Sequence, residues 1–252
     1  MQIVNSFLKK FFETMGFKIV RLSQIATPVY EQEFEQIYSL CKEYTMTSKE
    51  RMFALYNATK YIVESNIPGD FVECGVWRGG SAMLIALTLK SAKSKKRKIY
   101  LYDTYEGMVK PTKEDISAKD GSSALVTWDK SKNEGHNDWC YSSLDEVKSN
   151  MAQTGYSQGD LVFVKGLVEK SIPFNAPKKI ALLRLDTDWY ISTKHELTHL
   201  FPRLFAGGVL IIDDYGDWEG ARKAVNEYFS KSSGKVLLNM IDHTGRIGVK
   251  LK

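Results

Sequence analysis

The sequence places two acidic pairs directly after two apolar runs. The run ALLRL precedes Asp186 and Asp188, and the run VLII precedes Asp213 and Asp214. Apolar runs of this length, joined by an amphipathic crossover, predict two parallel strands that are buried on both faces. Ligands of such sheets bind beyond the carboxyl ends of the strands, so up to four carboxylates are expected to converge there.

Carboxylates that converge in this way repel one another and require a compensating positive charge. Two like charges about 4 Å apart repel by roughly 4 kcal/mol at an effective dielectric near 20. A bound cation removes that repulsion, and hard oxygen ligands favour Mg²⁺, Ca²⁺ or Mn²⁺ over Zn²⁺. The alternative is structural: Asp186 caps the crossover helix, while Asp213 and Asp214 open a turn.

A glycine-rich turn, GVWRGGS (75–81), follows the predicted strand DFVEC (70–74) and leads into a helix that ends near Ser91. Such a turn lets backbone N–H groups approach a ligand closely. It lacks the dinucleotide spacing G-x-G-x-x-G and the lysine of a P-loop. Glu73, at the end of the strand, would repel a pyrophosphate and favour a ligand that carries an ammonium or sulfonium group.

Another acid ends the next predicted strand, KIYLYD (98–103). The carboxylate of Asp103 can accept hydrogen bonds from both hydroxyls of a ribose. The alternative makes Asp103 a helix cap and Thr104 a turn residue. Beside Glu73 and the glycine turn, the ribose role is favoured.

His195 and His199 belong to the tract HELTH, which matches the zinc-protease motif H-E-x-x-H letter for letter. The predicted helix that carries them (192–205) lies between two buried strands, and no third ligand is defined. Pro202 follows in its last turn. The histidines are therefore expected to face solvent or to cap the end of the helix.

The elements that position these residues alternate between strand and helix, which predicts a doubly wound, mostly parallel α/β sheet closed by an antiparallel hairpin. A third strand is predicted at 161–165, and the closing strands at 236–240 and 246–251. Further helices are predicted at 1–20, 31–43, from Thr47 or Ser48 to 66, 143–154 (opened by the capping box SLDE) and 218–231.

Residues 107–140 show no convincing period and are rich in Lys, Ser, Gly, Asp and Asn. A stretch of this length without structure of its own is either disordered or a lid over a site. Because it carries Trp128, His136 and Trp139, we expect a lid that becomes ordered when a ligand binds.

Composition bounds the class of protein. The 252 residues are 43% hydrophobic and 26% charged, with a net charge of +5, which suits one soluble α/β domain with an extension. Lys90–Lys98 could touch nucleic acid or anionic lipid, but a solvated loop is favoured and no nucleic-acid partner is expected. Three scattered cysteines without metal or redox spacing favour a reduced, cytoplasmic setting.

Membrane insertion is not expected, since no apolar stretch approaches transmembrane length. Lys9, Lys10 and Glu13 interrupt the apolar residues near the start, which is unlike a signal peptide. The amphipathic helix predicted at 1–20 could lie on a membrane surface. Packing on its own domain or on a second subunit is favoured, so a homo-oligomer is expected.

Five ordered passages together carry a resemblance to a known family. They are YTMTSKERM (44–52), IPGDFVECGVWRGGS (67–81), LYDTYEGM (101–108), LRLDTDWYIST (183–193) and GGVLIIDDYGDWEGARKAV (207–225). The layout resembles that of class I S-adenosylmethionine-dependent methyltransferases, with a Rossmann-like seven-stranded sheet. The motifs themselves resemble the macrocin O-methyltransferase (TylF-type) family of magnesium-dependent sugar O-methyltransferases, many of which act on deoxysugars of glycosylated natural products.

The resemblance implies which residues bind the metal, which act as base and which contact the cofactor. It implies metal ligands at Asp186, Asp213 and Asp214, with Asp188 as candidate general base. Asp186 and Asp188 are thus the expected catalytic residues, and His136 of the lid is an alternative base. The expected contacts to S-adenosylmethionine are Glu73, Gly75, Val76, Gly79, Gly80, Ser81, Asp103 and Thr104. The expected domains are a helical extension (1–66) and a methyltransferase domain (67–252) with a lid near 107–140.

Three functions fit these observations. The first is metal-dependent transfer of a methyl group from S-adenosylmethionine to a hydroxyl of a sugar or glycosylated small molecule. The second is an O-methyltransferase for a catechol-like or other small hydroxyl acceptor, because a catechol also offers two adjacent oxygens to a metal. The third is a non-catalytic nucleotide- or metal-binding protein, which intact carboxylates at every expected position disfavour.

Overall fold

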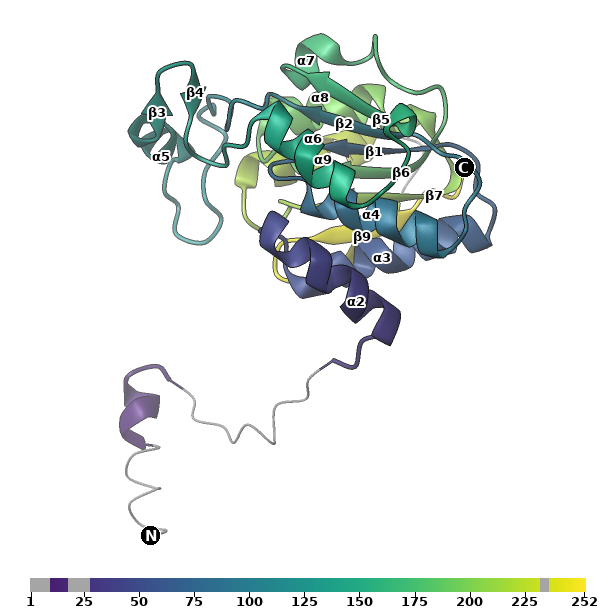
Figure 1. Cartoon of the computed structure of the whole chain (residues 1–252). Helices are drawn as coiled ribbons and strands as arrows, with labels where there is room; N and C mark the ends of the chain where they lie inside the picture. Colours follow the sequence, from purple (N-terminus) through teal and green to yellow (C-terminus); the bar gives the residue numbers. More distant parts are fainter. Residues whose placement is uncertain (1–9, 18–27, 232–235) are drawn as a thin grey trace. The chain divides into compact units, whose positions relative to one another are not determined.

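A seven-stranded sheet forms the centre of the protein in the computed structural model, which describes residues 10–17, 28–231 and 236–252 (Figure 1). Its strands are β1 (Asp70–Cys74), β2 (Ile99–Asp103), β5 (Leu161–Lys165), β6 (Ile180–Leu185), β7 (Leu204–Ile212), β8 (Asn239–Met240) and β9 (Arg246–Val249). Their order is β5-β2-β1-β6-β7-β9-β8. The first five run parallel, and β9 is antiparallel to β7 and β8. The predicted mostly parallel sheet is confirmed.

Three of the described helices begin at a serine whose side chain caps the first turn. The side-chain oxygens of Ser48 and Ser143 accept the backbone N–H groups of Arg51 and Glu146, each at 3.2 Å, and so open α3 and α6. The helices are α2 (Gln32–Cys41), α3 (Lys49–Glu64), α4 (Gly80–Ser91), α5 (Ala124–Lys130), α6 (Leu144–Gln153), α7 (Val168–Ser171), α8 (Tyr190–His199) and α9 (Glu219–Lys231), with 3₁₀ turns η2 (Lys42–Tyr44), η3 (Gln158–Asp160) and η4 (Phe201–Arg203).

The order of strands fixes where a ligand can bind. The crossovers β1–α4–β2 and β6–α8–β7 run in opposite directions from the middle of the sheet. Because such crossovers are right-handed, α4 and α8 cover opposite faces. α3 packs beside α4, and α9 packs beside α8 (Figure 1). The strand order reverses between β1 and β6, which is the point where open α/β sheets hold their ligands.

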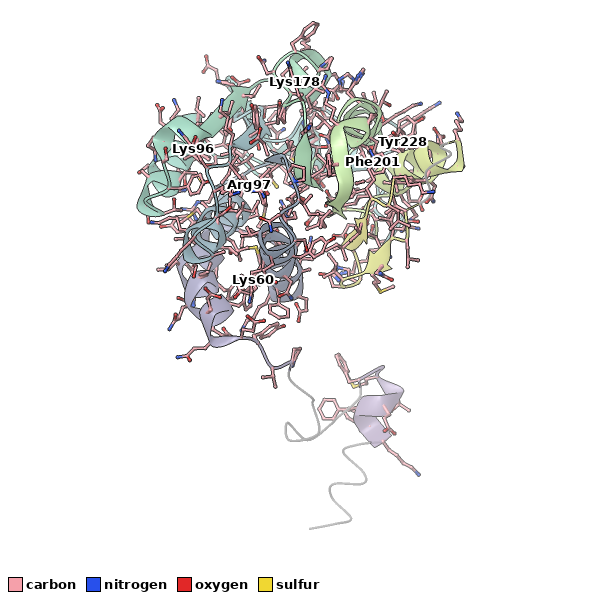
Figure 2. The ribbon with its side chains drawn as sticks, turned by 90° about the vertical axis from the view of Figure 1, so that its right-hand side faces the viewer. Lys60, Lys96, Arg97, Lys178, Phe201 and Tyr228 are labelled. Atoms are coloured by element: carbon pink, nitrogen blue, oxygen red, sulfur yellow. The ribbon has the colours of Figure 1, made fainter. Side chains whose placement is uncertain are left out.

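The core fills both faces of the sheet. All six residues of β6 are buried. The ring of Phe201, in η4, meets that of Tyr228, on α9, edge to face with centroids 5.6 Å apart (Figure 2). Aromatic pairs of this geometry add to the stabilisation that burial of apolar area provides. The result is a rigid platform beneath the loops that follow β6 and β7.

The helix predicted at 192–205 is shorter in the structure. α8 ends at His199, a 3₁₀ turn carries Pro202, and β7 begins at Leu204. Pro202 has no N–H to continue the helix. Gly207, with φ +86°, lies inside β7 rather than in a turn before it, where a side chain would meet Ile67.

Residues 107–140 have structure of their own, so the expectation of a stretch without it is wrong. α5 and the hairpin of β3 (Lys132–Asn133) and β4 (His136–Asn137) lie to one side of the main sheet (Figure 1). Trp128 donates its indole N–H to the carbonyl oxygen of Met108 at 2.7 Å. Asn137 donates to the carbonyl oxygen of Trp128 at 2.9 Å. These internal bonds organise a polar stretch that has little periodicity.

The chain divides into two compact units, Met1–Gln32 and Glu33–Lys252. The larger unit therefore begins before the boundary expected after residue 66, because α3 packs on α4, β6 and β7. Of the helix predicted at 1–20, residues 10–14 are helical, and 1–9 and 18–20 lie outside the described residues. Within the described ranges, no helix is long and apolar enough to span a membrane.

Candidate active site

A cavity of about 580 Å³ opens at the carboxyl ends of the strands, on both sides of the β1–β6 junction. This volume is within the range of small-molecule sites. Its walls come from the loops after β1, β2, β5, β6 and β7, from residues 44–47 and from the segment 107–112. The expected convergence of loops at this edge of the sheet is therefore present.

Three of the four aspartates form one cluster on the cavity wall. One oxygen each of Asp186, Asp188 and Asp214 lies within 4.8 Å of the other two. Asp188 has a left-handed backbone with φ +67°, an unusual conformation for a residue with a Cβ. Three carboxylates at this spacing are a ligand set for a hard divalent cation.

The electrostatics of the cluster reflect burial and mutual repulsion. Burial is the largest cause that raises the pKa of Asp214, and repulsion from Asp188 and Asp186 raises it further. Burial likewise raises the pKa of Asp188 to about 7, while a hydrogen bond to Asp214 opposes the shift. Each carboxylate thus gains stability from any cation that enters the cluster.

A second set of acids lies deeper and is neutralised by arginine. Arg184, on β6, is 1% exposed. Its Nη1 lies 2.6 Å from Oε1 of Glu73 and 2.7 Å from Oδ2 of Asp186. Its Nη2 donates to Thr47 Oγ1 at 2.9 Å. Buried charges persist only when paired in this way.

Asp213 belongs to this deeper set. Its Oδ1 is 2.8 Å from Nη2 of Arg184, an ion contact without hydrogen-bond alignment, and its Oδ2 accepts from Nη1 of Arg51. Arg51 also pairs with Asp242, with Nε 3.0 Å from Oδ2. The expected role of Asp213 as a metal ligand stays a prediction, because arginines hold both of its oxygens here.

The glycine turn brings backbone close to the aspartates. Gly75 has φ +81°, and a Cβ there would fall 1.9 Å from the carbonyl oxygen of Asp186, so no side chain fits. Oδ2 of Asp103 accepts the N–H of Val76 at 2.7 Å and that of Trp77 at 3.2 Å. Asp103 thereby joins the end of β2 to the turn after β1.

The residues expected at the cofactor divide into two groups. Gly75, Val76, Ser81, Asp103 and Thr104 line the cavity. Glu73, Gly79 and Gly80 are not cavity-lining residues. Glu73 is fully buried and bonded to Ser81 and Arg184, so the expected direct contact with a sulfonium ligand has no open surface. Gly80 packs against the backbone of Tyr44.

The histidines lie apart from the aspartates. His136, the alternative base, is on the β3–β4 hairpin, does not line the cavity, and has Nε2 2.9 Å from Asp138 Oδ1. His195 bonds to the carbonyl oxygen of Ile172 at 3.0 Å. Glu196 is fully buried and accepts from Thr187 at 2.9 Å, away from that pair. In the described part of the chain, the group of side chains that could hold a metal ion is the aspartate triad rather than the H-E-x-x-H tract.

Sequence reasoning missed the two arginines and an aromatic wall. Arg184 interrupts a fully buried apolar run, and that charge is the signal that a buried partner exists. Trp139, Trp189 and Trp218 come from three loops and line the cavity with ring centroids 4.9–5.9 Å apart. Nothing in their spacing along the sequence indicated that they would meet.

Comparisons with known proteins agree with this geometry. The model of the macrocin O-methyltransferase (TylF) family matches residues 38–248. A tetracenomycin-rhamnosyl 4'-O-methyltransferase of Streptomyces olivaceus is 31% identical over 202 residues, which cover 80% of this chain and 74% of that protein. The mycinamicin III 3''-O-methyltransferase of Micromonospora griseorubida is 31% identical over 185 residues, 73% of this chain and 70% of its own length.

Solved structures show the same fold. The O-methyltransferase NovP superposes with a TM-score of 0.71 at 26% identity, covering 83% of each chain. The calicheamicin methyltransferase CalS11 gives a TM-score of 0.61 at 16% identity, covering 92% of this chain and 98% of that one, a likeness of fold alone. The chain therefore belongs to the macrocin O-methyltransferase (TylF) family and is an S-adenosylmethionine-dependent O-methyltransferase with the class I fold.

Proposed function

We propose that this enzyme methylates a hydroxyl of a sugar within a glycosylated small molecule, and that the transfer requires a divalent cation. The observation that carries the proposal is the triad of Asp186, Asp188 and Asp214 beside a cavity that is also lined by the glycine turn and Asp103. The relatives named for a rhamnosyl tetracenomycin and for mycinamicin support a glycosylated acceptor.

The methyl donor is proposed to lie along the turn after β1. Gly75, Ser81 and Thr104 line the same space, and the absence of a side chain at Gly75 lets this turn pack on Asp186. Asp103, which lines the cavity at the end of β2, would accept the ribose hydroxyls. Glu73 would act indirectly, because its carboxylate orients Ser81 and Arg184.

The carboxylate cluster fits a hard divalent cation by the chemistry of its donors. Asp186 and Asp214, common to the sequence prediction and to the observed cluster, would hold Mg²⁺, or Mn²⁺ or Ca²⁺ in its place. Such an ion would supply Lewis-acid stabilisation of the acceptor oxygen. Asp213 would join them as a ligand only by releasing an arginine contact.

Asp188 is proposed as the general base. Burial raises its pKa to about 7 in the metal-free site, and a cation held by Asp186 and Asp214 would lower it, so that Asp188 stays ionised and can accept the proton. The acceptor hydroxyl would give its proton to Asp188, its oxygen would form a bond to the methyl carbon, and the carbon–sulfur bond of the donor would break. S-adenosylhomocysteine leaves with the electron pair of that bond.

The aromatic wall would orient the acceptor and exclude water. Trp139, Trp189 and Trp218 offer flat apolar faces next to the acids. An in-line methyl transfer needs the reacting atoms held about 3–3.5 Å apart, so positioning carries much of the rate. Trp139 comes from the 107–140 segment, which we propose covers the bound acceptor.

An acceptor screen tests this function. The purified chain would be incubated with S-adenosylmethionine and Mg²⁺ beside deoxysugar glycosides, their aglycones and catechols, and products would be identified by mass spectrometry. Methylation of a glycoside on its sugar, lost on chelation and regained with Mg²⁺, is expected. Methylation of the catechols alone, or turnover that is indifferent to chelation, would contradict the proposal.

A further inference from the structure

Asp115 is a fully buried acid outside the cavity wall. It lies in the 107–140 segment, where the sequence gives no sign of its role. Its Oδ2 accepts the backbone N–H of Thr112 at 2.7 Å and the hydroxyl of Thr112 at 2.8 Å. Its Oδ1 accepts the backbone N–H of Tyr190 at 2.8 Å. A carboxylate is seldom buried this completely without such a set of donors.

The bond to Tyr190 fixes the loop that carries the proposed base. Tyr190 is the first residue of α8 and comes two residues after Asp188. The left-handed conformation of Asp188 persists only if the surroundings hold it. On the other side, the hydroxyl of Thr187 donates to the buried Glu196 at 2.9 Å. The strained residue is thus clamped from both flanks by buried acids.

Asp115 also touches the second acid-bearing loop. A Cβ on Gly220, in the first turn of α9, would fall 2.1 Å from Asp115 Oδ1. Around this contact, Glu219 N–H donates to Ile116 O at 2.9 Å and Ala118 N–H donates to Asp217 O at 2.8 Å. The loop from Asp214 to Gly220 and the loop from Asp186 to Tyr190 therefore meet on one side chain.

From this geometry we infer that Asp115 is a positioning residue for methyl transfer. It fixes the position of the Asp188 loop relative to the Asp214 loop. It also fixes both loops relative to the segment that supplies Trp139. The electrostatics agree, since its carboxylate lies at the N-terminal ends of α8 and α9, where helix dipoles favour negative charge. The inference rests on the proposed function because it takes Asp188 and Asp214 as working groups.

Three variants separate positioning from mere structural support. Asp115→Ala removes every hydrogen bond that the carboxylate accepts from Thr112 and Tyr190. Asp115→Asn keeps one oxygen that can accept the backbone N–H of Tyr190. Gly220→Ala leaves Asp115 in place but adds a methyl group that would clash with its carboxylate. Asp120→Ala is the matched control, because Asp120 is an exposed acid of the same segment whose side chain bonds to Ser122.

The measurements are kcat, the KM of the acceptor and the Kd of S-adenosylhomocysteine, with circular dichroism to check the fold. A misplacement of about 1 Å costs on the order of 100-fold in rate, and this is the fall in kcat expected for Asp115→Ala. The Kd of S-adenosylhomocysteine is expected to stay unchanged. Asp115→Asn should restore most of the kcat, and Asp120→Ala should match the parent enzyme.

Gly220→Ala should also lower kcat in the parent enzyme, but it should cost less in the Asp115→Ala background, where the clash with Oδ1 is gone and the contact of the new Cβ with Tyr190 N at 3.1 Å remains. An unchanged kcat in Asp115→Ala would overturn the inference. So would a loss in which the Kd of S-adenosylhomocysteine rises by the same factor. Additive losses from Gly220→Ala and Asp115→Ala would overturn it too.

A crystal structure of Asp115→Ala keeps the inference testable if the parent enzyme methylates none of the acceptors. In that case the proposed acceptor is wrong, and the geometry decides about positioning. The expected result is that Asp188 leaves its positive φ and that the oxygens of the triad separate beyond the present 4.8 Å. An unmoved triad would refute the positioning role. The same structure replaces the kinetic comparison if the variant proves hard to assay.

Discussion

Two groups of acids share one edge of the sheet and differ in what neutralises them. The inner acids, Glu73 and Asp213, are bound by Arg184, and Asp213 also by Arg51. The outer acids, Asp188 and Asp214, line the cavity and form no ion pair with an arginine of the described residues, and Asp186 touches both groups. The inner acids are compensated within the protein, so they serve the fold. The outer acids lack a cationic partner within the protein, so they are suited to binding a cationic ligand.

The comparison explains why neighbouring residues of one loop differ so much. Asp213, directly after β7, contacts the guanidinium groups of Arg51 and Arg184, whereas Asp214 belongs to the triad. Burial without a close cation raises the pKa of Asp214 well above its ordinary value. Burial of charge is tolerated only where an opposite charge is fixed or where one can bind.

Removing Arg184 should break the inner group. In Arg184→Met, Glu73 and Asp186 lose their cationic partner while Asp213 keeps Arg51, and we expect the free energy of unfolding to fall by roughly 3–5 kcal/mol in urea titrations. Adding Glu73→Gln to that variant should recover part of the loss, because one uncompensated charge disappears. A loss below about 1 kcal/mol would mean that the arginine does not hold the inner acids.

Changing an outer acid should affect chemistry instead of stability. Asp214→Asn should lower kcat by at least about 100-fold, near 3 kcal/mol of barrier. Its melting temperature without divalent ions should equal or exceed that of the parent, since repulsion within the triad is relieved. Differential scanning fluorimetry and a methyl-transfer assay give both readings. If Asp214→Asn melted far lower while retaining turnover, the division between inner and outer acids would be reversed.

Glu196 tests how burial acts on an acid outside both groups. Burial raises its pKa to about 8, against about 4.3 in the unfolded chain. The folded state therefore binds the extra proton between these values, so this contribution to stability is complete below pH 4.3 and lost as pH rises through 8.

In the parent enzyme, this group should cost about 2 kcal/mol of stability between pH 6 and pH 8. Glu196→Gln keeps an acceptor for Thr187 and cannot titrate, so its stability should fall less over that range. Urea titrations of both proteins at the two pH values give the difference. Identical pH dependence would show that Glu196 is ionised in the folded protein.

An exposed ion pair gives the reference value against which the stability effects of the buried charges are compared. Nζ of Lys165 lies 2.8 Å from Oε1 of Glu106, with both side chains about half exposed. Solvent screens such pairs, so Lys165→Ala should change the free energy of unfolding by less than about 1 kcal/mol. A larger change would mean that solvent exposure does not separate functional from incidental charge in this protein.

Local sequence pattern was sufficient for the parallel strands and for the acids that follow them, whereas the closing strand predicted at 236–240 is confined to β8 (Asn239–Met240). Apolar runs that end in Asp186 and Asp213 report burial directly, and the glycine of the turn after β1 is where backbone needs φ above zero. The mostly parallel, doubly wound sheet followed from the alternation of strand and helix.

Contacts between segments that are distant in the sequence could not be predicted from local sequence pattern. Arg51 reaches Asp213 from α3, and Asp115 reaches Tyr190 from a segment without periodicity. Both depend on tertiary packing, which no local window encodes. The expected roles of Glu73 and His136 ignored the same effect, because burial under Arg184 and attachment to Asp138 decide where those side chains point.

Calorimetric titration of Mg²⁺ into the metal-free enzyme, with S-adenosylhomocysteine present, tests the central claim most directly. The account predicts one Mg²⁺ per chain in the parent enzyme and an affinity at least tenfold weaker in Asp186→Asn and in Asp214→Asn, since each removes one of the oxygens grouped within 4.8 Å. Absence of Mg²⁺ binding by the parent, or equal affinity in all three proteins, would contradict it.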